Sequence, residues 1–212
     1  MAVTQNTLIG RSSGSVGGVT FATWKGLNIM KSKAVSVANP DTIAQQKQRN
    51  KMALIVGIYR LISSIVQVGF KTQAVGKSEY NAFVSDNIKT AISADSSAVA
   101  TLDPELLTIA KGTIGVVEID DVTQSGPEDF AVNWTDTIPV GGASSDFAYA
   151  LAYDPTADVF VQSTASSTRA DETITISFPT GSTVSASTQF YLFFKSASSE
   201  NVSDSVTEQG FS

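Results

Sequence analysis

The sequence predicts an α+β fold in which an N-terminal β-ribbon and an α-helical hairpin precede an antiparallel β-sandwich. Apolar residues recur at helical spacing in the second quarter of the chain, whereas apolar and polar residues alternate with a period of two in the second half. Before both, a glycine-rich approach leads into a hairpin signal that turns at Lys25-Gly26. The expected parts are an arm and ribbon over residues 1–40, the helical hairpin over 41–103 and the β-sandwich over 104–212.

The ribbon is expected on both sides of Lys25-Gly26. Residues 1–17 are rich in Ser, Thr, Gly and Asn and predict an arm rather than a packed element. Residues 19–24 and 27–30 have the pattern of two strands, and Gly26 supplies the positive φ that their turn needs. Because an isolated hairpin is only marginally stable, we expect it to lie on the helix or on another subunit.

A long helix is expected after the ribbon. Pro40 disfavours a helical conformation at Asn39, and Asp41 or Thr42 can cap the first free N–H groups. The helix is expected to run to about Val68, with a wet first third. Its apolar stripe comprises Leu54, Ile58, Leu61, Ile62 and Ile65, widened by Ile55, Tyr59 and Val66, and burial is predicted along Leu54, Ile58, Leu61 and Ile65.

The apolar part of this helix, residues 52–70, is near the length of a membrane span. Arg60 lies near its middle, and an arginine at the centre of a span costs about 2.5–3.5 kcal/mol on insertion scales. A buried helix is therefore favoured over a membrane span.

A second amphipathic helix is expected over residues 78–92, with Ser78 as its cap, folded back on the first. Residues 93–103 are small and polar, and together with Pro104 they mark the expected domain boundary.

Beyond the boundary, short segments of alternating residues are separated by Gly, Pro, Asp and Ser turns, a spacing typical of a β-sandwich. The predicted strands lie near residues 106–109, 114–118, 130–135, 147–153, 159–163, 173–178, 189–194 and 202–206.

The net charge of −6 conceals a division along the chain. Residues 1–77 carry ten Lys or Arg against one acid, whereas residues 78–212 carry four against nineteen acids. This asymmetry indicates an acidic partner for the N-terminal part, or copies that pack basic part against acidic part. The alternative is that the basic residues only solvate one helix and one hairpin.

The chain has no His and no Cys. A Ser-His-Asp triad, a thiol nucleophile and a zinc site built on His or Cys are therefore excluded. Adjacent carboxylates such as Asp120-Asp121 and Asp171-Glu172 point to opposite faces of a strand, so we expect solvated turns there, with a weak Ca²⁺ site at Asp120 or Asp121 as the alternative. We expect no enzymatic activity, no metal and no cofactor.

The candidate interaction site combines the basic residues of the N-terminal part with a tryptophan: Trp24, Lys25, Lys31, Lys33, Lys47, Arg49 and Lys51. The candidate turn and cap residues are Gly26, Asn39, Pro40, Asp41 and Thr42. Such a site suits an acidic protein surface, or the phosphates of a nucleic acid, although no recognised nucleic-acid-binding motif is present.

The chain resembles an uncharacterised family of roughly two-hundred-residue proteins, found mainly in Bacteroidota genomes and their phages. The residues that carry the resemblance are Gly14…Gly17, Trp24-Lys25-Gly26, Lys31, Asn39-Pro40…Thr42…Gln45, Gln48-Arg49, Gly69-Phe70, Tyr80-Asn81 and Val202-Ser203-Asp204-Ser205. Relatives tend to have an aromatic residue where this chain has Met52. The C-terminal half resembles a fibronectin type III-like domain, on Trp134, Tyr149 to Tyr153 and residues 189–194. The resemblance implies an architecture and a phage or surface-assembly context, with no catalytic activity.

We therefore expect a non-enzymatic structural protein that works in many copies, in a virion (phage capsid or tail-associated) or a surface assembly, as a homo-oligomer or with other assembly subunits. The alternatives are a nucleic-acid-binding accessory protein and a sugar-binding adhesive module with exposed aromatics. Since the N-terminus lacks the order of a secretory signal, we expect synthesis in the cytoplasm and a mature location in the assembly.

Overall fold

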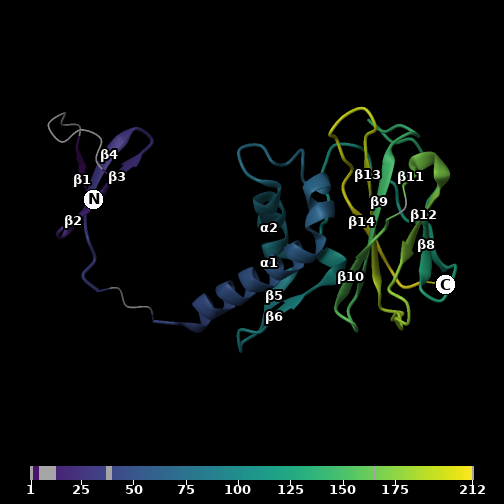
Figure 1. Ribbon diagram of the computed structural model, residues 1–212, viewed down its shortest axis with the longest axis horizontal. Coiled ribbons are helices and arrows are strands. Elements are labelled where there is room, and N and C mark those ends of the chain that lie inside the picture. The colour runs from purple at the N-terminus through teal and green to yellow at the C-terminus, as the bar shows by residue number, and fades with distance from the viewer. Residues whose placement is uncertain (1, 5–12, 37–39, 165, 212) are drawn as a thin grey trace. The chain divides into compact units, whose positions relative to one another are not determined.

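The computed structural model describes residues 2–4, 13–36, 40–164 and 166–211 (Figure 1). The chain divides into two compact units, Met1–Thr42 and Ile43–Ser212. Strands make up the first unit, and two helices followed by antiparallel sheets make up the second. The predicted α+β class is confirmed.

The N-terminal unit is a four-stranded sheet of order β1-β4-β3-β2. Its centre is the predicted hairpin, in which β3 (Val19–Trp24) pairs with β4 (Leu27–Ser32). Lys25 and Gly26 turn the chain with φ values of 48° and 82°, as a two-residue hairpin turn of this hand requires.

The predicted arm contains two strands that the sequence did not indicate. β1 (Ala2–Thr4) pairs with β4, and β2 (Gly14–Val16) pairs with β3. A two-stranded ribbon leaves unpaired N–H and C=O groups along both edges, which a short extended segment can satisfy whatever its side chains are. The polar composition of these residues therefore concealed the strands.

The first helix, α1 (Ile43–Gly69), begins and ends within two residues of the prediction. The predicted stripe was partly wrong: Leu61 is 66% exposed and Leu54 is only partly buried, whereas Ile55 and Ile62 are fully buried. The backbone of Ile62 leaves helical geometry, with φ −114° and ψ 20°. Because Leu54-Ile55 and Leu61-Ile62 each offer two adjacent apolar residues, spacing alone could not decide which of them faces the core.

Length and composition alone would allow α1 to cross a membrane, a test that the core helix of a soluble protein also passes. In the structure one side of α1 packs on the second helix, α2 (Glu79–Thr90). The Tyr59 and Tyr80 rings contact each other edge to face, with 4.8 Å between the ring centres. Ser78 caps α2 as predicted, since its Oγ accepts a hydrogen bond from the Asn81 N–H at 3.2 Å.

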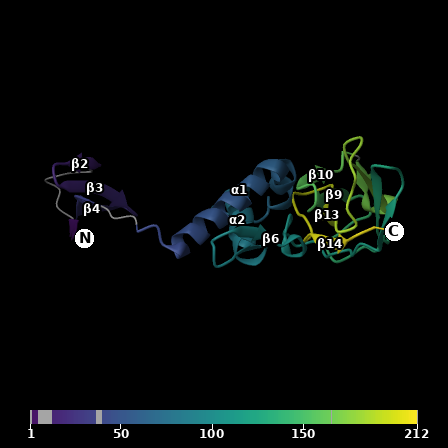
Figure 2. The same cartoon turned by 90° about the horizontal axis from the view of Figure 1, so that it is seen from below.

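The expected boundary segment forms a hairpin of β5 (Ile92–Ala94) and β6 (Ala100–Leu102), and both strands contact α1. The helices and this hairpin lie on one side of a five-stranded sheet of order β10-β9-β13-β14, in which β11 also pairs with β9 (Figures 1 and 2). These strands are β9 (Phe147–Asp154), β10 (Val159–Gln162), β11 (Ser167–Thr168), β13 (Gln189–Lys195) and β14 (Val206–Gln209).

The other side of the five-stranded sheet faces a three-stranded sheet of order β12-β8-β7, which completes the predicted sandwich. These strands are β7 (Asp121–Gln124), β8 (Asp129–Asn133) and β12 (Thr173–Ser177). The five-stranded sheet thus has a core on each side: Tyr191 and Phe193 join the helical core, and Phe190 and Leu192 join the sandwich core. A run of six buried residues in β13 follows from this position between two layers.

Several predicted strands are absent among the described residues. The strand predicted near residues 106–109 does not form, and Leu106 instead ends the 3₁₀ turn η1 (Pro104–Leu106). A second 3₁₀ turn, η2 (Arg169–Asp171), precedes β12. In place of the strands predicted near residues 114–118 and 202–206, Ile114 and Val202 each make only an isolated bridge. The last strand begins at Val206. β7 was missed because its sequence, Asp-Val-Thr-Gln, is that of a polar edge strand with one buried residue.

Candidate interaction surface

The aromatic residue of the candidate site, Trp24, ends β3 directly before the β3–β4 turn. The Trp24 side chain is 60% exposed, and the Lys25 Nζ lies 5.0 Å from the centre of its ring. At this distance the ammonium group interacts with the π-face of the indole. A large apolar surface beside a positive charge is typical of a residue that anchors a partner.

Strand register divides the N-terminal sheet into two faces. Trp24 lies opposite Leu27, Ala22 opposite Ile29 and Thr20 opposite Lys31, so these residues share one face. The other face carries the pairs Phe21–Met30 and Val16–Val19. Each face is therefore partly apolar.

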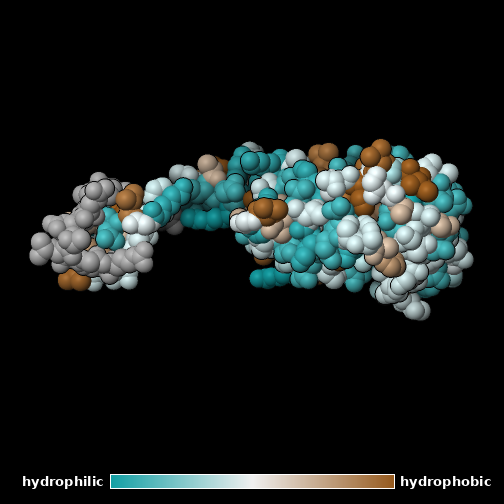
Figure 3. Space-filling model, turned by 90° about the horizontal axis from the view of Figure 1, so that it is seen from above, coloured by the Kyte–Doolittle hydropathy of each residue, from teal (hydrophilic) through white to brown (hydrophobic). Residues whose placement is uncertain are grey.

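The described part of this unit has no core. Among residues 13–36 and 40–42, no residue is buried, and Val16 is 73% exposed. Hydrophobic side chains reach the surface of this unit in Figure 3. A sheet of this kind lacks the packed second layer that normally stabilises a small β-structure.

The remaining candidate residues lie elsewhere. Lys31 and Lys33 are exposed on and after β4, in the N-terminal unit, whereas the three candidate residues on α1 belong to the second unit: Lys47 and Lys51 are half-buried and Arg49 is exposed. The structure therefore groups the basic site into two sets, one on each unit.

The predicted turn and cap residues surround the unit boundary. Asn39 lies outside the described residues. Pro40, Asp41 and Thr42 directly precede α1, and Asp41 has a left-handed φ of 46°. A capping role for Asp41 or Thr42 stays a prediction.

Acidic residues gather near β7 and the end of β8. Asp121 accepts a hydrogen bond from Asn133 at 2.7 Å, Asp120 accepts one from Thr135 at 2.6 Å, and Glu172 accepts one from the Asp136 N–H at 3.1 Å. Asp121 begins a strand and does not lie in the expected turn. Within the described residues, no group of three or more His, Cys, Asp or Glu side chains could hold a metal ion.

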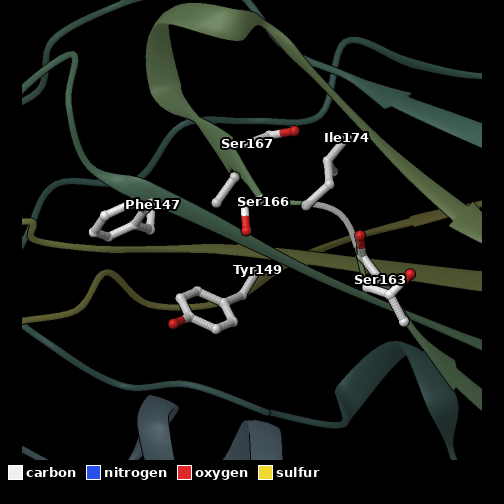
Figure 4. A pocket seen from close by; sticks show the side chains of 8 residues that line it. Phe147, Tyr149, Ser163, Ser166, Ser167 and Ile174 are labelled. Carbon is white, nitrogen blue, oxygen red and sulfur yellow. The ribbon is translucent and has the colours of Figure 1, made fainter.

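A cavity of about 200 Å³ opens on the edge of β9, where the chain between β10 and β11 leaves the sheet (Figure 4). Phe147 and Tyr149 line it from β9, Ser167 lines it from β11, and Ser163 and Ser166 line it from the segment between β10 and β11. Its described lining residues are uncharged, so the cavity offers hydroxyl groups and aromatic rings but no acid or base for chemistry.

The model of DUF6266, a family of unknown function, matches residues 11–208. The chain belongs to the DUF6266 family. The match covers both units and confirms the resemblance to an uncharacterised family. No curated protein sequence matches this DUF6266 chain.

Proposed function

We propose that this DUF6266 protein is a non-enzymatic structural component that works in many copies, joined to its neighbours through the N-terminal unit. One observation carries the proposal: the four-stranded sheet exposes apolar side chains on both faces, with no buried residue among its described ones. Burying Trp24 and Leu27 against a partner would supply the missing layer.

Charge gives this contact a direction. Residues 1–42 carry four Lys or Arg against one acid, residues 43–77 of the second unit carry six against none, and residues 78–212 carry four against nineteen acids. A basic unit that meets an acidic surface of another copy makes a heterologous contact, which generates rings or filaments. A virion or a cell-surface assembly is the setting that we propose for such a structure.

The topology of the second unit supports an immunoglobulin- or fibronectin III-like module as the body of the assembly. In chain order, β7, β8 and β12 take the places of strands A, B and E, while β9, β10, β13 and β14 take those of C, C′, F and G. Modules of this kind serve as rigid spacers in many cell-surface proteins.

Sedimentation of the full chain and of a chain that lacks residues 1–38, each at low and at high salt, tests the proposal. The full chain should associate at low salt and associate less at high salt, because salt screens the contact, and the shortened chain should associate much more weakly than the full chain at low salt. A full chain that is monomeric at high concentration and low salt would refute the proposal. A gel shift with duplex DNA and RNA at the same two salt concentrations detects the alternative, nucleic-acid binding.

A further inference from the structure

The exposed side of α1 carries a shallow groove of about 620 Å³. Ala53 and Gly57 form its floor, Met52 and Val56 its apolar walls, and Arg49 and Arg60 line its two ends. We call these six residues the α1 groove. A Cβ added at Gly57 would meet no atom within 4 Å, so the floor is open at this position.

The sandwich carries a protrusion of matching character, residues 136–142, which we call the 136–142 loop. Its Val140 and Ile138 side chains are 90% and 61% exposed. The loop is nevertheless held in place: the Gly115 N–H donates to the Val140 carbonyl at 3.0 Å, and the Gly142 N–H donates to the Pro139 carbonyl at 3.0 Å. Two apolar side chains are thus held toward solvent on a fixed backbone, which lowers the entropic cost of docking them.

We propose that the 136–142 loop of one copy docks in the α1 groove of the next. Within one copy both surfaces are exposed, so the loop does not cover the groove of its own chain. Ile138 and Val140 would pack on the floor of small residues, where they can approach the helix backbone closely. The inference rests on the proposed multi-copy function and names one contact by which the copies meet.

Charge selects this occupant over a second α1. Two α1 grooves placed face to face, in either direction, would bring arginines together at both ends, a like-charge contact that is unfavourable. The loop instead begins at Asp136, whose N–H donates to the Glu172 carboxylate at 3.1 Å, so two acidic residues lie at the start of the loop. These carboxylates suit the Arg60 end of the groove.

Steric and apolar variants of the full chain test the contact by sedimentation at low salt. Gly57→Trp places an indole in the groove at a position where a Cβ meets no atom within 4 Å, and Val140→Lys places on the tip of the loop a charge that the groove arginines repel. Each should weaken association by about tenfold or more, as loss of a central interface anchor does. Gln67→Trp, on the exposed surface of the same helix outside the groove, is the matched control and should leave association unchanged.

A charge exchange provides a second measurement, because misfolding cannot produce recovery of association in a double variant. Thermal unfolding checks that each variant is folded, since Asp136 also acts electrostatically on the buried Arg169. Arg60→Glu alone and Asp136→Lys alone should each weaken association. The chain that carries both substitutions should recover it, because every groove then meets a loop of opposite charge.

The outcomes separate the inference from the function on which it rests. If Gly57→Trp and Val140→Lys associate like the unchanged chain while removal of residues 1–38 abolishes association, the N-terminal unit is the joint and the loop–groove contact is wrong. If the double exchange fails to recover association that both single changes weakened, the pairing of Arg60 with Asp136 is wrong. If the unchanged full chain is monomeric, both the inference and the proposed function fail.

Discussion

Ile62 and Leu61 are neighbours with opposite environments. Ile62 is 1% exposed in the helical core, whereas Leu61 is 66% exposed. We predict that Ile62→Asp destabilises the protein by about 4 kcal/mol, because it buries an unpaired carboxylate. Leu61→Asp should cost no more than about 1 kcal/mol, mainly through the lower helix propensity of Asp. Urea unfolding of both variants checks this, and equal losses would contradict the assigned core.

Arg169 is fully buried in the sandwich, an expensive place for a charge. Its Nη2 lies 3.4 Å from Asp146 Oδ2 and its guanidinium lies 4.0 Å from the centre of the Phe194 ring, while Nε and Nη1 have no hydrogen-bond partner among the described residues. Burial lowers the pKa of Arg169, and the nearby Asp146 carboxylate opposes that shift. The ion pair therefore only partly offsets the cost of removing both charges from water.

Asp146→Ala should accordingly destabilise the protein by about 3–5 kcal/mol, because it leaves the guanidinium buried and unpaired. Arg169→Met combined with Asp146→Asn removes both charges. The asparagine keeps a side-chain oxygen for the hydrogen bond that the Ala143 N–H donates to Asp146 Oδ2 at 2.8 Å. The double variant should be more stable than Asp146→Ala in thermal and urea unfolding. A double variant that is the less stable of the two would show that the pair is a net stabilising interaction.

Tyr153 makes stability depend on alkaline pH. Burial, followed by a hydrogen bond at 3.0 Å to the Asp158 carboxylate, raises the pKa of Tyr153 from 10.0 to about 12. Because folding favours the protonated phenol, its contribution is complete below pH 10 and is lost as the pH rises through about 12. We expect Tyr153→Phe to reduce the loss of stability over that range, as measured by unfolding at a series of pH values. An unchanged pH profile would contradict this.

At the scale of the element, β13 is the strand that contributes side chains to both hydrophobic cores of the second unit. Phe193 and Phe194 are both 1% exposed, but Phe193 belongs to the helical core and Phe194 to the sandwich core. A strand with one solvated face would tolerate one of the two truncations. We predict that Phe193→Ala and Phe194→Ala each cost about 3–5 kcal/mol, measured by urea unfolding. Thr175→Ala, on the exposed face of β12, is the control and should change stability by less than about 0.5 kcal/mol.

At the scale of the whole molecule, the two units should differ in local stability. The five-stranded sheet is packed on both sides, whereas the N-terminal sheet has no buried residue among its described ones. In the monomer, amide hydrogens of β3 and β4 should therefore exchange much faster than those of β9 and β13. Association should protect β3 and β4 selectively. Hydrogen exchange below and above the association midpoint measures both effects, and strong protection of β3 and β4 in the monomer would contradict the prediction.

The sequence by itself determined the local features of this protein. The Lys25-Gly26 turn, the start of α1, the Ser78 cap and most sandwich strands follow from backbone preferences and from periodicity, which act within a few residues. The exclusion of thiol and histidine chemistry likewise follows from composition alone. The basic character of the N-terminal part could also be recognised in advance, because charge does not depend on the fold.

Only the tertiary structure decided which apolar residue of an adjacent pair is buried, as at Leu61 and Ile62, because that choice depends on where α2 and the five-stranded sheet lie. It also decided that β1, β2 and β7 are strands, since an edge strand forms through backbone hydrogen bonds to a neighbouring strand whatever its own side chains are. The α1 groove and the 136–142 loop could not be predicted from the sequence either, because their exposure depends on how the chain packs. An apolar residue in a chain becomes a surface feature only when packing leaves it uncovered.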